Sequence, residues 1–558
     1  MNTGDSGNWK NTLYFGDNLD VLKKYIPNDF ADLIYIDPPF NSGATYNILF
    51  KPTSKKTAKE SAQIQAFEDT WTWGEESIST FQGIVTGAIT KEPIPSEVVS
   101  LIETLYSFLK ESSMMAYLVM MTPRLVELHR VLKRTGSIYV HCDPTASHYL
   151  KLLMDGVFGP ENFKNEVIWK RTSGHSDSGV MGNTHDTLLF YSKSATMVWN
   201  RQYQPYDEKY IESHYRRVDK KGRRYRTDNL TAMGLSGGGY TYEWHGVTKL
   251  WRMPIERMRD LDTQGRVKYT STGTAEYVRY LDEMPGTPLQ DVWNDIPPIN
   301  SQAAERLGYP TQKPEALLAR IINASSNPGD VVLDAFAGCG TATAVAQKLG
   351  RRWVGIDIAI PAVDVIVKRL QESILSNGHH LEEGVDFDVI GMPKDVASAE
   401  ALARTYGDGW QFQYWAVTRI MGAIGSTKKT GDGGVDGTIS FLDHSKPNKI
   451  GKAIISVKSN KAVAPAMVHD LYGSIVANKA DFGILVTLEE PTHGMRNEAL
   501  KYTPYKFNGK MDIPLVQLLS AADLFKKPLP LVLPSENMVI DRKKGDSVVV
   551  VQKEELPM

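Results

Sequence analysis

The stretch Val332-Leu-Asp-Ala-Phe-Ala-Gly-Cys-Gly-Thr341 combines an apolar strand, a glycine-rich turn and the start of a helix. The two glycines let the backbone approach a ligand closely, and the start of the helix offers unpaired N–H groups. A second strand ends at Asp357, where a carboxylate can accept ribose hydroxyls. Because Asp334 precedes the turn, the pattern suits a cationic moiety, such as a sulfonium or an amino group, better than a pyrophosphate. An ordinary tight turn is the alternative.

Another predicted strand ends in a proline turn, within the stretch Asp32-Leu-Ile-Tyr-Ile-Asp-Pro-Pro-Phe-Asn41. The two prolines fix their own φ angles, and the second restricts the first. The Asp37 carboxylate and the Pro38 carbonyl are therefore expected to point in fixed directions, with the Phe40 ring beside them. Two acceptors and a flat ring suit an aromatic amine, and the ends of strands in α/β sheets carry sites. The alternative is a proline turn with a capping aspartate.

Length and composition limit the class of protein. The 558 residues predict about three to five folding units. A net charge of −2, from 63 Lys and Arg against 65 Asp and Glu, excludes a uniformly basic nucleic-acid coat protein. The two cysteines exclude a disulfide framework and a cysteine-rich zinc site. Without a signal peptide or an apolar run of roughly 20 residues, we expect a cytoplasmic chain that does not enter a membrane.

Four regions alternate in character along the chain. Residues 10–194 and 309–376 have the strand–helix pattern of a parallel sheet covered by helices. Between positions 201 and 280 there are 16 Lys and Arg against 10 Asp and Glu, and 12 aromatic residues, so this segment is basic and aromatic. Residues 377–405 are expected to form a linker or a small embellishment, and residues 406–535 a separate α/β domain.

Asp37-Pro-Pro-Phe40 and Phe336-Ala-Gly-Cys-Gly340 resemble the two signature motifs of DNA methyltransferases that methylate amino groups with S-adenosylmethionine. The catalytic motif comes first, which resembles the permuted β group, and type III modification subunits in particular. The resemblance covers about residues 10–376. It implies one Rossmann-like domain from residues 10–194 and 309–376, with residues 195–308 inserted as a target-recognition region. Further segments resemble the same group: Phe15-Gly-Asp-Asn18, Phe67–Trp73, Gly159–Phe163, Ile168–Arg171, Thr311–Pro314 and Leu317–Ile321.

The resemblance implies methyl transfer to the amino group of a base extruded from double-stranded DNA. The expected catalytic residues are Asp37, Pro38, Pro39 and Phe40. The expected cofactor-binding residues are Asp17, Lys313, Asp334, Phe336, Gly338, Gly340, Thr341 and Asp357. An aspartate-led motif favours adenine N6 in this family, while cytosine N4 stays open. A methyltransferase of RNA or protein is a third hypothesis, against which the basic, aromatic insertion argues.

A dense basic cluster lies in the insertion, and it can contact several phosphates of a duplex. The alternative interpretation is a charged surface segment that contacts only solvent. The cluster consists of Arg216, Arg217, Lys220, Lys221, Arg223, Arg224 and Arg226.

The C-terminal domain carries a second pair of candidate residues, Asp436 in Gly431-Asp-Gly-Gly-Val-Asp-Gly437 and Lys458 in the following strand. A carboxylate and a lysine can act with a divalent ion on a phosphodiester. The segment resembles the Mrr-like branch of restriction-endonuclease folds, which implies Asp436 as a ligand of Mg²⁺. Ser456 stands where the family usually has a carboxylate or a glutamine. Gln413 lies on the helix where the family often has a glutamate. Cleavage of DNA and mere binding of DNA or a partner therefore both stay open.

The expected setting is a restriction–modification or defence system. The sequence has no GxxxxGK[ST] loop, so a translocating motor would have to be another chain. A homodimer and a separate restriction or motor subunit both stay open.

Overall fold

The computed structural model describes residues 10–39, 44–49, 63–69, 71–172, 180–232, 239–300, 302–309, 311–373, 378–405, 409–426, 434–446, 450–460 and 462–534. The chain divides into two compact units, Met1–Trp199 with Val292–Met558, and Asn200–Asp291. Among the helices in the described ranges, none has the length and apolar character that crossing a membrane requires.

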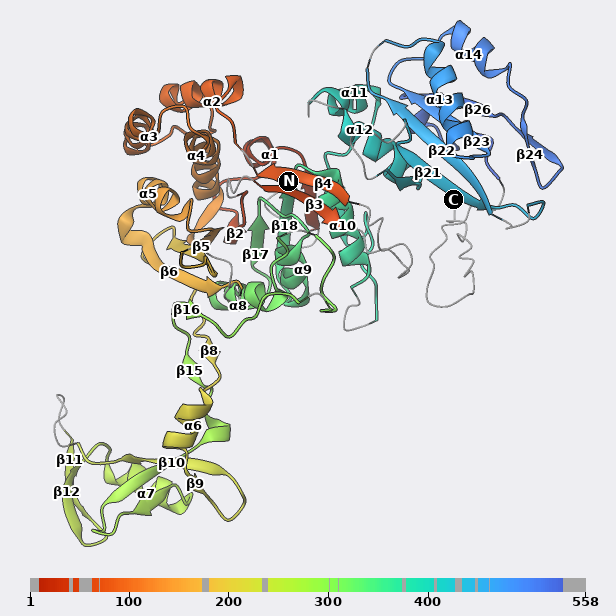
Figure 1. The fold of residues 1–558 in the computed structure, drawn as a ribbon. Helices are drawn as coiled ribbons and strands as arrows, with labels where there is room; N and C mark the ends of the chain where they lie inside the picture. Colours follow the sequence, from red (N-terminus) through yellow and green to blue (C-terminus); the bar gives the residue numbers. More distant parts are fainter. Residues whose placement is uncertain are drawn as a thin grey trace. The chain divides into compact units, whose positions relative to one another are not determined.

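The first unit contains a nine-stranded sheet in the order β16-β6-β7-β5-β2-β17-β18-β1-β19. Strands from before residue 200 and after residue 291 lie side by side in it, so both flanks of the second unit build one sheet (Figure 1). The strands are β1 (Asn11–Phe15), β2 (Ala31–Ile36), β5 (Leu132–Cys142), β6 (Phe163–Lys170), β7 (His185–Ser192), β16 (Val292–Trp293), β17 (Val331–Asp334), β18 (Arg352–Asp357) and β19 (Phe387–Ile390).

The sheet is parallel from β5 to β19, as the sequence predicts, but not at its other edge. Strand β7 runs antiparallel to both β5 and β6. The described residues between β6 and β7 include no helix, and strands joined without a crossover helix run antiparallel. The expectation of a purely parallel sheet is therefore wrong for this edge.

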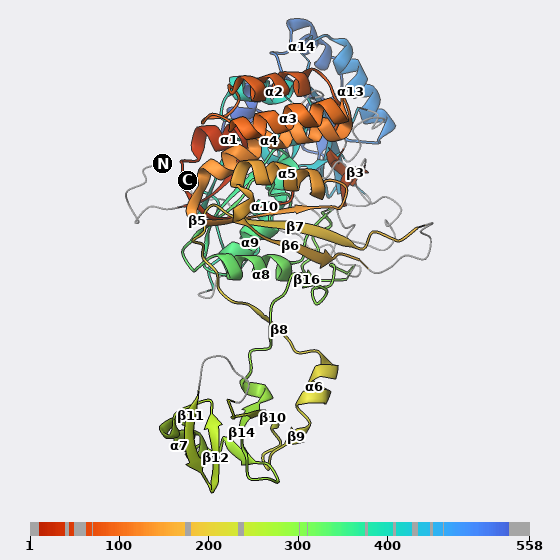
Figure 2. The same ribbon diagram turned by 90° about the vertical axis from the view of Figure 1, so that its left-hand side faces the viewer.

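Helices cover both faces of the sheet (Figure 2). Helices α1 (Asn18–Tyr25), α4 (Ser113–Val131) and α5 (Ser147–Phe158) lie on one face, and α8 (Glu315–Ser325) and α9 (Thr341–Lys348) on the other. Helix α10 (Ile360–Gln371) packs against α9. Helix α4 is almost entirely buried because α2 (Glu75–Thr86) and α3 (Ser96–Leu109) also pack against it. The hydroxyl of Ser112 starts α4 by accepting a hydrogen bond from Met115 N. A hairpin, β3 (Ala44–Leu49) with β4 (Gln63–Asp69), and the short helix η2 (Pro160–Asn162) complete this region.

The sequence suggested a linker or a small embellishment for residues 377–405, and residues 378–405 contain a strand and a helix. Strand β19 adds to the sheet beside β1, in parallel, and its Phe387 is buried. Helix α11 (Val396–Thr405) follows. The apolar signal in the sequence is short because only four residues form the strand.

The C-terminal part of the first unit has its own five-stranded sheet, in the order β20-β21-β22-β23-β26. The apolar residues of α13 and of the central strands form its core. Helix α12 continues into the π-helical turn η4, where the sequence predicts one helix from Phe412 to Gly422. The elements are α12 (Trp410–Tyr414), η4 (Trp415–Ile420), β20 (Ile424–Gly425), β21 (Gly437–Leu442), β22 (Ile450–Lys458), α13 (Ala466–Ala477), β23 (Phe482–Thr487), α14 (His493–Ala499), β24 (Tyr505–Phe507), β25 (Met511–Ile513), β26 (Val516–Ser520) and η5 (Asp523–Phe525).

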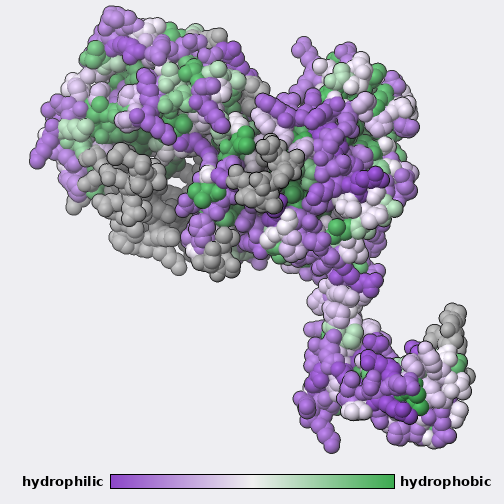
Figure 3. Space-filling view, turned by 180° about the vertical axis from the view of Figure 1, so that it is seen from behind, coloured by the Kyte–Doolittle hydropathy of each residue, from purple (hydrophilic) through white to green (hydrophobic). Residues whose placement is uncertain are grey.

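The second unit is a small α/β unit around a four-stranded antiparallel sheet, β13-β14-β10-β9. Trp251 and Met258 are fully buried in its apolar core. On the face shown in Figure 3 its surface is mostly hydrophilic, as its basic composition predicts. Its elements are β8 (Tyr203–Gln204), α6 (Glu208–His214), β9 (Arg217–Val218), β10 (Arg224–Asn229), β11 (Tyr240–Trp244), β12 (Val247–Trp251), α7 (Ile255–Thr263), β13 (Val267–Tyr269), β14 (Ala275–Tyr280), η3 (Leu281–Glu283) and β15 (Thr287–Pro288).

Candidate active site

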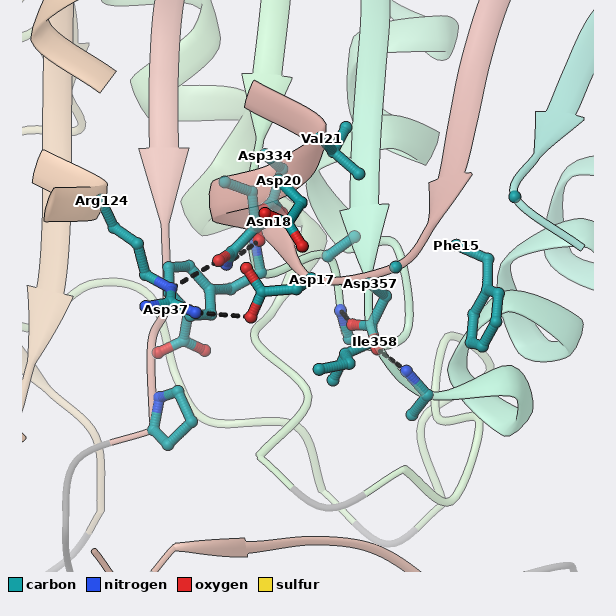
Figure 4. A pocket seen from close by; sticks show the side chains of 18 of the residues that line it. Phe15, Asp17, Asn18, Asp20, Val21, Asp37, Arg124, Asp334, Asp357 and Ile358 are labelled. Carbon is teal, nitrogen blue, oxygen red and sulfur yellow. Dashed lines mark hydrogen bonds and ion pairs between the residues drawn. The ribbon is translucent and has the colours of Figure 1, made fainter. Parts of the chain in front are cut away.

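Four carboxylates meet at one edge of the nine-stranded sheet. Asp334 and Asp357 are the last residues of β17 and β18, Asp37 follows β2, and Asp17 follows β1. These four strands are adjacent and parallel, so their carboxyl ends open on the same side. A cavity of about 930 Å³ lies there, and all four aspartates line it (Figure 4).

The glycine-rich turn forms part of the cavity wall. Gly338 and Gly340 have φ angles of 54° and 70°, which glycine adopts without strain. A Cβ at Gly340 would also come within 2.7 Å of Ile366. Phe336, Gly338 and Thr341 line the cavity, whereas Gly340 lies behind it as the N-cap of α9. The turn therefore places Phe336, Gly338 and Thr341 at the cavity, whereas Gly340 determines the shape of the turn.

Burial makes this cavity electrostatically unusual. It raises the pKa of Asp357 to about 6, although that carboxylate accepts hydrogen bonds from Gly338 N (2.7 Å) and Ala359 N (2.9 Å). Burial also holds the pKa of Asp334 well above its usual range, and the negative charges of Asp37 and Asp357 add to that effect. Closely spaced buried carboxylates are stabilised by a positive charge between them. These carboxylate acceptors therefore fit a ligand with a cationic group and ribose hydroxyls.

Asp37 has two oxygens in different environments. Lys313 Nζ donates to Oδ2 at 2.5 Å, and the lysine is only 7% exposed. Oδ1 is buried and has no hydrogen-bond partner within the described part of the chain. A buried acceptor without a partner costs free energy unless a ligand satisfies it. Lys313, expected at the cofactor, thus holds the carboxylate in place and leaves one oxygen for a donor.

The proline turn after β2 is only partly visible. Pro39 lines the cavity and Pro38 is buried beside it. Phe40 lies outside the described residues. The structure thus brings Asp37 and Pro39 together with the glycine-rich turn and leaves the stacking prediction for Phe40 as it was.

Asp17 belongs to a network that the sequence did not reveal. Its Oδ1 caps α1 by accepting from Leu19 N at 2.7 Å, and its Oδ2 accepts from the guanidinium of Arg124 at 2.6 Å. Arg124 also donates from Nε to Asn18 Oδ1 at 2.6 Å. The signal in the sequence was an arginine in the middle of the apolar helix α4, whose other arginine, Arg130, lies in its last turn. Arg124 fixes the β1–α1 turn at the cavity wall (Figure 4).

A buried chain of polar groups supports the floor of the cavity. Tyr35 lines it, and its hydroxyl lies 2.9 Å from Nδ1 of His141. Nε2 of that ring lies 3.0 Å from Asp186 Oδ2. Burial, together with the nearby Asp37 charge, holds the pKa of Tyr35 well above its usual range. The neutral phenol is therefore fixed near the end of β2, a feature that no local motif predicts.

The basic cluster of the second unit is divided in its contacts. Arg223 pairs with Asp282 and Glu283 of the same unit, and Arg226 donates to the Tyr210 hydroxyl at 2.7 Å. Arg217 lies 3.5 Å from Glu276. The remaining members are exposed: Arg216, Lys220, Lys221 and Arg224. These four are the better placed for phosphates, and Arg223 mainly stabilises its own unit.

The second candidate site, at Asp436 and Lys458, is much shallower than the cavity at the nine-stranded sheet. Asp436 Oδ2 accepts a hydrogen bond from Val457 N at 2.7 Å, next to Lys458 on β22. The adjoining depression, lined by Trp410, Gln413 and Asp436 among others, holds about 10 Å³, roughly the space for one water molecule. No group of three His, Cys, Asp or Glu side chains that could hold a metal occurs in the described ranges. The donors shown do not by themselves fit a Mg²⁺ site, which draws on several oxygen ligands.

Comparison with known proteins agrees with both regions. Residues 31–368 match a family model described as DNA methylase, and residues 412–526 match one described as restriction endonuclease. The type II methyltransferase M.EcaI of Enterobacter cloacae is 32% identical over 46% of this chain and 57% of its own length. The StyLTI Mod subunit of a type III restriction-modification enzyme, from Salmonella typhimurium, is 28% identical over 62% of this chain and 51% of its length.

A third relative is the DNA adenine methyltransferase YhdJ of Escherichia coli, which is 26% identical over 65% of this chain and 84% of its length. The chain spans little more than half the length of the first two relatives. The match to the family model covers both motifs that line the cavity, Asp37-Pro-Pro and the glycine-rich turn. The chain belongs to the DNA methylase family.

Proposed function

We propose that this chain transfers a methyl group from S-adenosylmethionine to the amino group of a base extruded from double-stranded DNA, with adenine N6 as the acceptor. The carrying observation is Asp37, whose Oδ2 is held by Lys313 while its buried Oδ1 has no partner in the described residues. The adenine specificity of the relative YhdJ favours adenine, and cytosine N4 is the alternative acceptor.

The residues divide the task along the cavity. Asp357 would accept the ribose hydroxyls and Asp334 would face the cationic end of the cofactor, with Phe336, Gly338 and Thr341 on the wall. S-adenosylmethionine supplies an electrophilic methyl group on a sulfonium. Asp17, with Arg124, would fix the turn at the adenine end. The roles of Asp334 and Asp357 follow from the chemistry of their side chains, and the adenine end at Asp17 follows from the resemblance of Phe15-Gly-Asp-Asn18 to the family.

Asp37 addresses the weak nucleophilicity of a base amino group, whose lone pair is delocalised into the ring. Its free Oδ1 would accept one N–H of that group, and the Pro38 carbonyl would accept the other. This orients the nitrogen lone pair out of the ring plane and stabilises the positive charge that develops on nitrogen. The new N–C bond forms as the methyl–sulfur bond breaks, and one amino proton leaves to solvent.

We propose that residues 10–194 and 309–376 form the catalytic domain, with residues 195–308 for target recognition. Arg216, Lys220, Lys221 and Arg224 would contact phosphates, because their charged groups are exposed. The direct test uses labelled S-adenosylmethionine with DNA, RNA and protein acceptors, followed by sequencing of the methylated DNA. Methylated adenine at a fixed site supports the proposal; label in RNA or protein alone contradicts it.

A second function is proposed for residues 406–535, cleavage of DNA with Mg²⁺, because residues 412–526 match the restriction endonuclease model. Asp436 would contribute one metal ligand and Lys458 a cation beside the scissile phosphate. Metal-dependent nicking of unmethylated DNA tests this function. If no divalent ion and no DNA substrate gives nicking, the domain serves to bind DNA or a partner. That binding would occur within a homodimer or beside a separate restriction or motor subunit.

A further inference from the structure

The cavity has a wall that lies outside the methyltransferase family match. The match ends at residue 368, yet Gly391, Pro393, Ser398, Ala401 and Leu402 also line the cavity. These residues belong to the segment that connects the catalytic region to the endonuclease-like domain. The cavity is therefore completed by a part of the chain that the family motifs do not contain.

Backbone geometry brings this segment to the cavity. Strand β19 pairs with β1 up to Ile390, and Gly391 then crosses the end of β1 with a φ angle of 104°. A Cβ at this position would come within 2.0 Å of the carbonyl oxygen of Phe15. Only glycine allows this approach, so the crossing next to the β1–α1 turn is a built feature.

Helix α11 then presents one face to the cavity. Ser398, Ala401 and Leu402 are spaced at i, i+3 and i+4, which places them on the same side of the helix. Ala399 and Ala403 on another side are buried. Ala401 is exposed although Leu402 beside it is buried, and Ala401 lines the open cavity.

The next helix holds the loop that carries Asp357. Gln411 of α12 donates from Nε2 to Ile358 O at 2.9 Å, and its Oε1 accepts from Ile360 N at 2.9 Å. Both contacts are made with residues that directly follow Asp357 in sequence. Arg419 of η4 forms a further ion pair with Asp364 of α10, 2.5 Å away. The first helices of the endonuclease-like domain are thus bonded to the cofactor side of the sheet.

We propose that residues 391–405 and 409–411 form an additional cofactor-binding element, in which α11 forms a wall of the cavity that Phe15 and Ile358 also line, and Gln411 positions the Asp357 loop. The proposal rests on the proposed binding of S-adenosylmethionine. Because binding free energies are reciprocal, an occupied cavity stabilises α11 and α12, and a change in these helices alters cofactor affinity. Cofactor occupancy thereby acts on the start of the endonuclease-like domain.

Calorimetric titration of the full chain with S-adenosylhomocysteine tests the wall. Ala401→Trp fills the cavity and should weaken binding by about tenfold or more, which corresponds to about 1.4 kcal/mol. Ala397→Trp is the matched control, since Ala397 is exposed on the same helix but does not line the cavity. It should bind within about twofold of the unchanged chain.

Hydrogen exchange on the unchanged chain gives an independent readout. Amides of residues 396–405 and 410–414 should exchange more slowly when S-adenosylhomocysteine is present. Binding by Ala401→Trp equal to that of the control, or exchange in α11 that the ligand does not alter, would overturn the proposal even if one variant folds poorly. If the unchanged chain does not bind S-adenosylhomocysteine at all, the proposed methyltransferase function fails instead.

Discussion

The sequence predicts both candidate sites from aspartates at the ends of strands and from glycine-rich turns. The structures of the two sites differ. At the nine-stranded sheet, four parallel strand ends each contribute a carboxylate to a cavity of about 930 Å³. At the five-stranded sheet, Asp436 borders a depression of about 10 Å³ and bonds to the backbone of the neighbouring strand.

The difference shows that a motif becomes a site through its neighbours. Asp37 has one oxygen held by a buried lysine and one left over, and Asp334 and Asp357 lie along the same edge. Asp436 has Lys458 on the next strand, but the described residues contain no group of three His, Cys, Asp or Glu side chains that could hold a metal. The groups around the large cavity are preorganised for a ligand. The groups around Asp436 would need a metal, a substrate or a further ligand to complete a site.

The largest effect should come from Asp37→Asn. This change keeps the shape of the side chain but removes the negative charge that would stabilise the developing charge on the amino nitrogen. We expect methyl transfer to fall by about 10³-fold, since removal of one preorganised electrostatic contact costs 10²–10³ or more. Transfer of labelled methyl groups to DNA measures the loss.

Binding of S-adenosylhomocysteine to Asp37→Asn serves as the control and should stay within about threefold, since other residues would hold the cofactor. Full methyl transfer by this variant would remove Asp37 from the catalytic site and erase the contrast between the two regions.

A smaller effect is expected from Lys313→Met, which removes the group that fixes Asp37 Oδ2. The carboxylate should then adopt several orientations, and a misplaced reacting group costs up to about 10²-fold. We expect kcat to fall by that order with little change in KM for DNA. Lys313→Arg should recover part of the rate, because it restores a cation; no recovery would indicate that Lys313 contributes packing alone.

Cofactor affinity should depend on pH through Asp357, whose pKa burial raises to about 6. The ionised carboxylate is the better acceptor for ribose hydroxyls, so affinity is full above pH 7 and declines as pH falls through 6. At pH 5 the dissociation constant should be about tenfold larger than at pH 7. Titration of S-adenosylhomocysteine at several pH values measures the profile.

Asp357→Asn is the matched variant for that profile, since it cannot ionise. It should bind more weakly at pH 7 and lose most of the dependence between pH 5 and 7. A slope that persists unchanged in Asp357→Asn would assign the titration to another group, with buried Asp334 as the first to examine.

Much of the fold around the large cavity could be predicted from the sequence, because its signals are local. Apolar strands followed by Asp37-Pro-Pro and by the glycine-rich turn specify both the elements and the edge of the sheet where they end. Strand ends that are far apart in sequence meet because parallel sheets align them. Arg124 and the Tyr35–His141–Asp186 chain could not be predicted, since each depends on contacts between residues about 45 to 107 positions apart.

The part of the cavity wall that α11 forms could not be predicted from the sequence either. Ser398, Ala401 and Leu402 are small or apolar residues without a chemical signature. Only the pairing of β19 with β1 and the close approach at Gly391 bring them to the cavity. A short strand of four residues after a charged stretch gives too weak a periodicity to place it in a sheet.

The smallest expected effect tests whether Asp436 is a catalytic group or a structural one. Asp436→Ala leaves the buried Val457 N–H without its partner, which should cost about 1–3 kcal/mol of domain stability. Asp436→Asn retains a side-chain oxygen that can accept this hydrogen bond, so its stability should lie close to that of the unchanged chain. Thermal or denaturant unfolding measures the difference.

Methyl transfer by both variants should stay within about twofold, because the two sites use separate sheets. If Mg²⁺-dependent nicking is present and is lost in the stable Asp436→Asn and in Lys458→Ala, the second region is a nuclease site despite its shallow depression. If nicking persists in Asp436→Asn and Lys458→Ala, the aspartate serves the fold of β22. The contrast between a preorganised cavity and a strand-end hydrogen bond then holds in function as well as in structure.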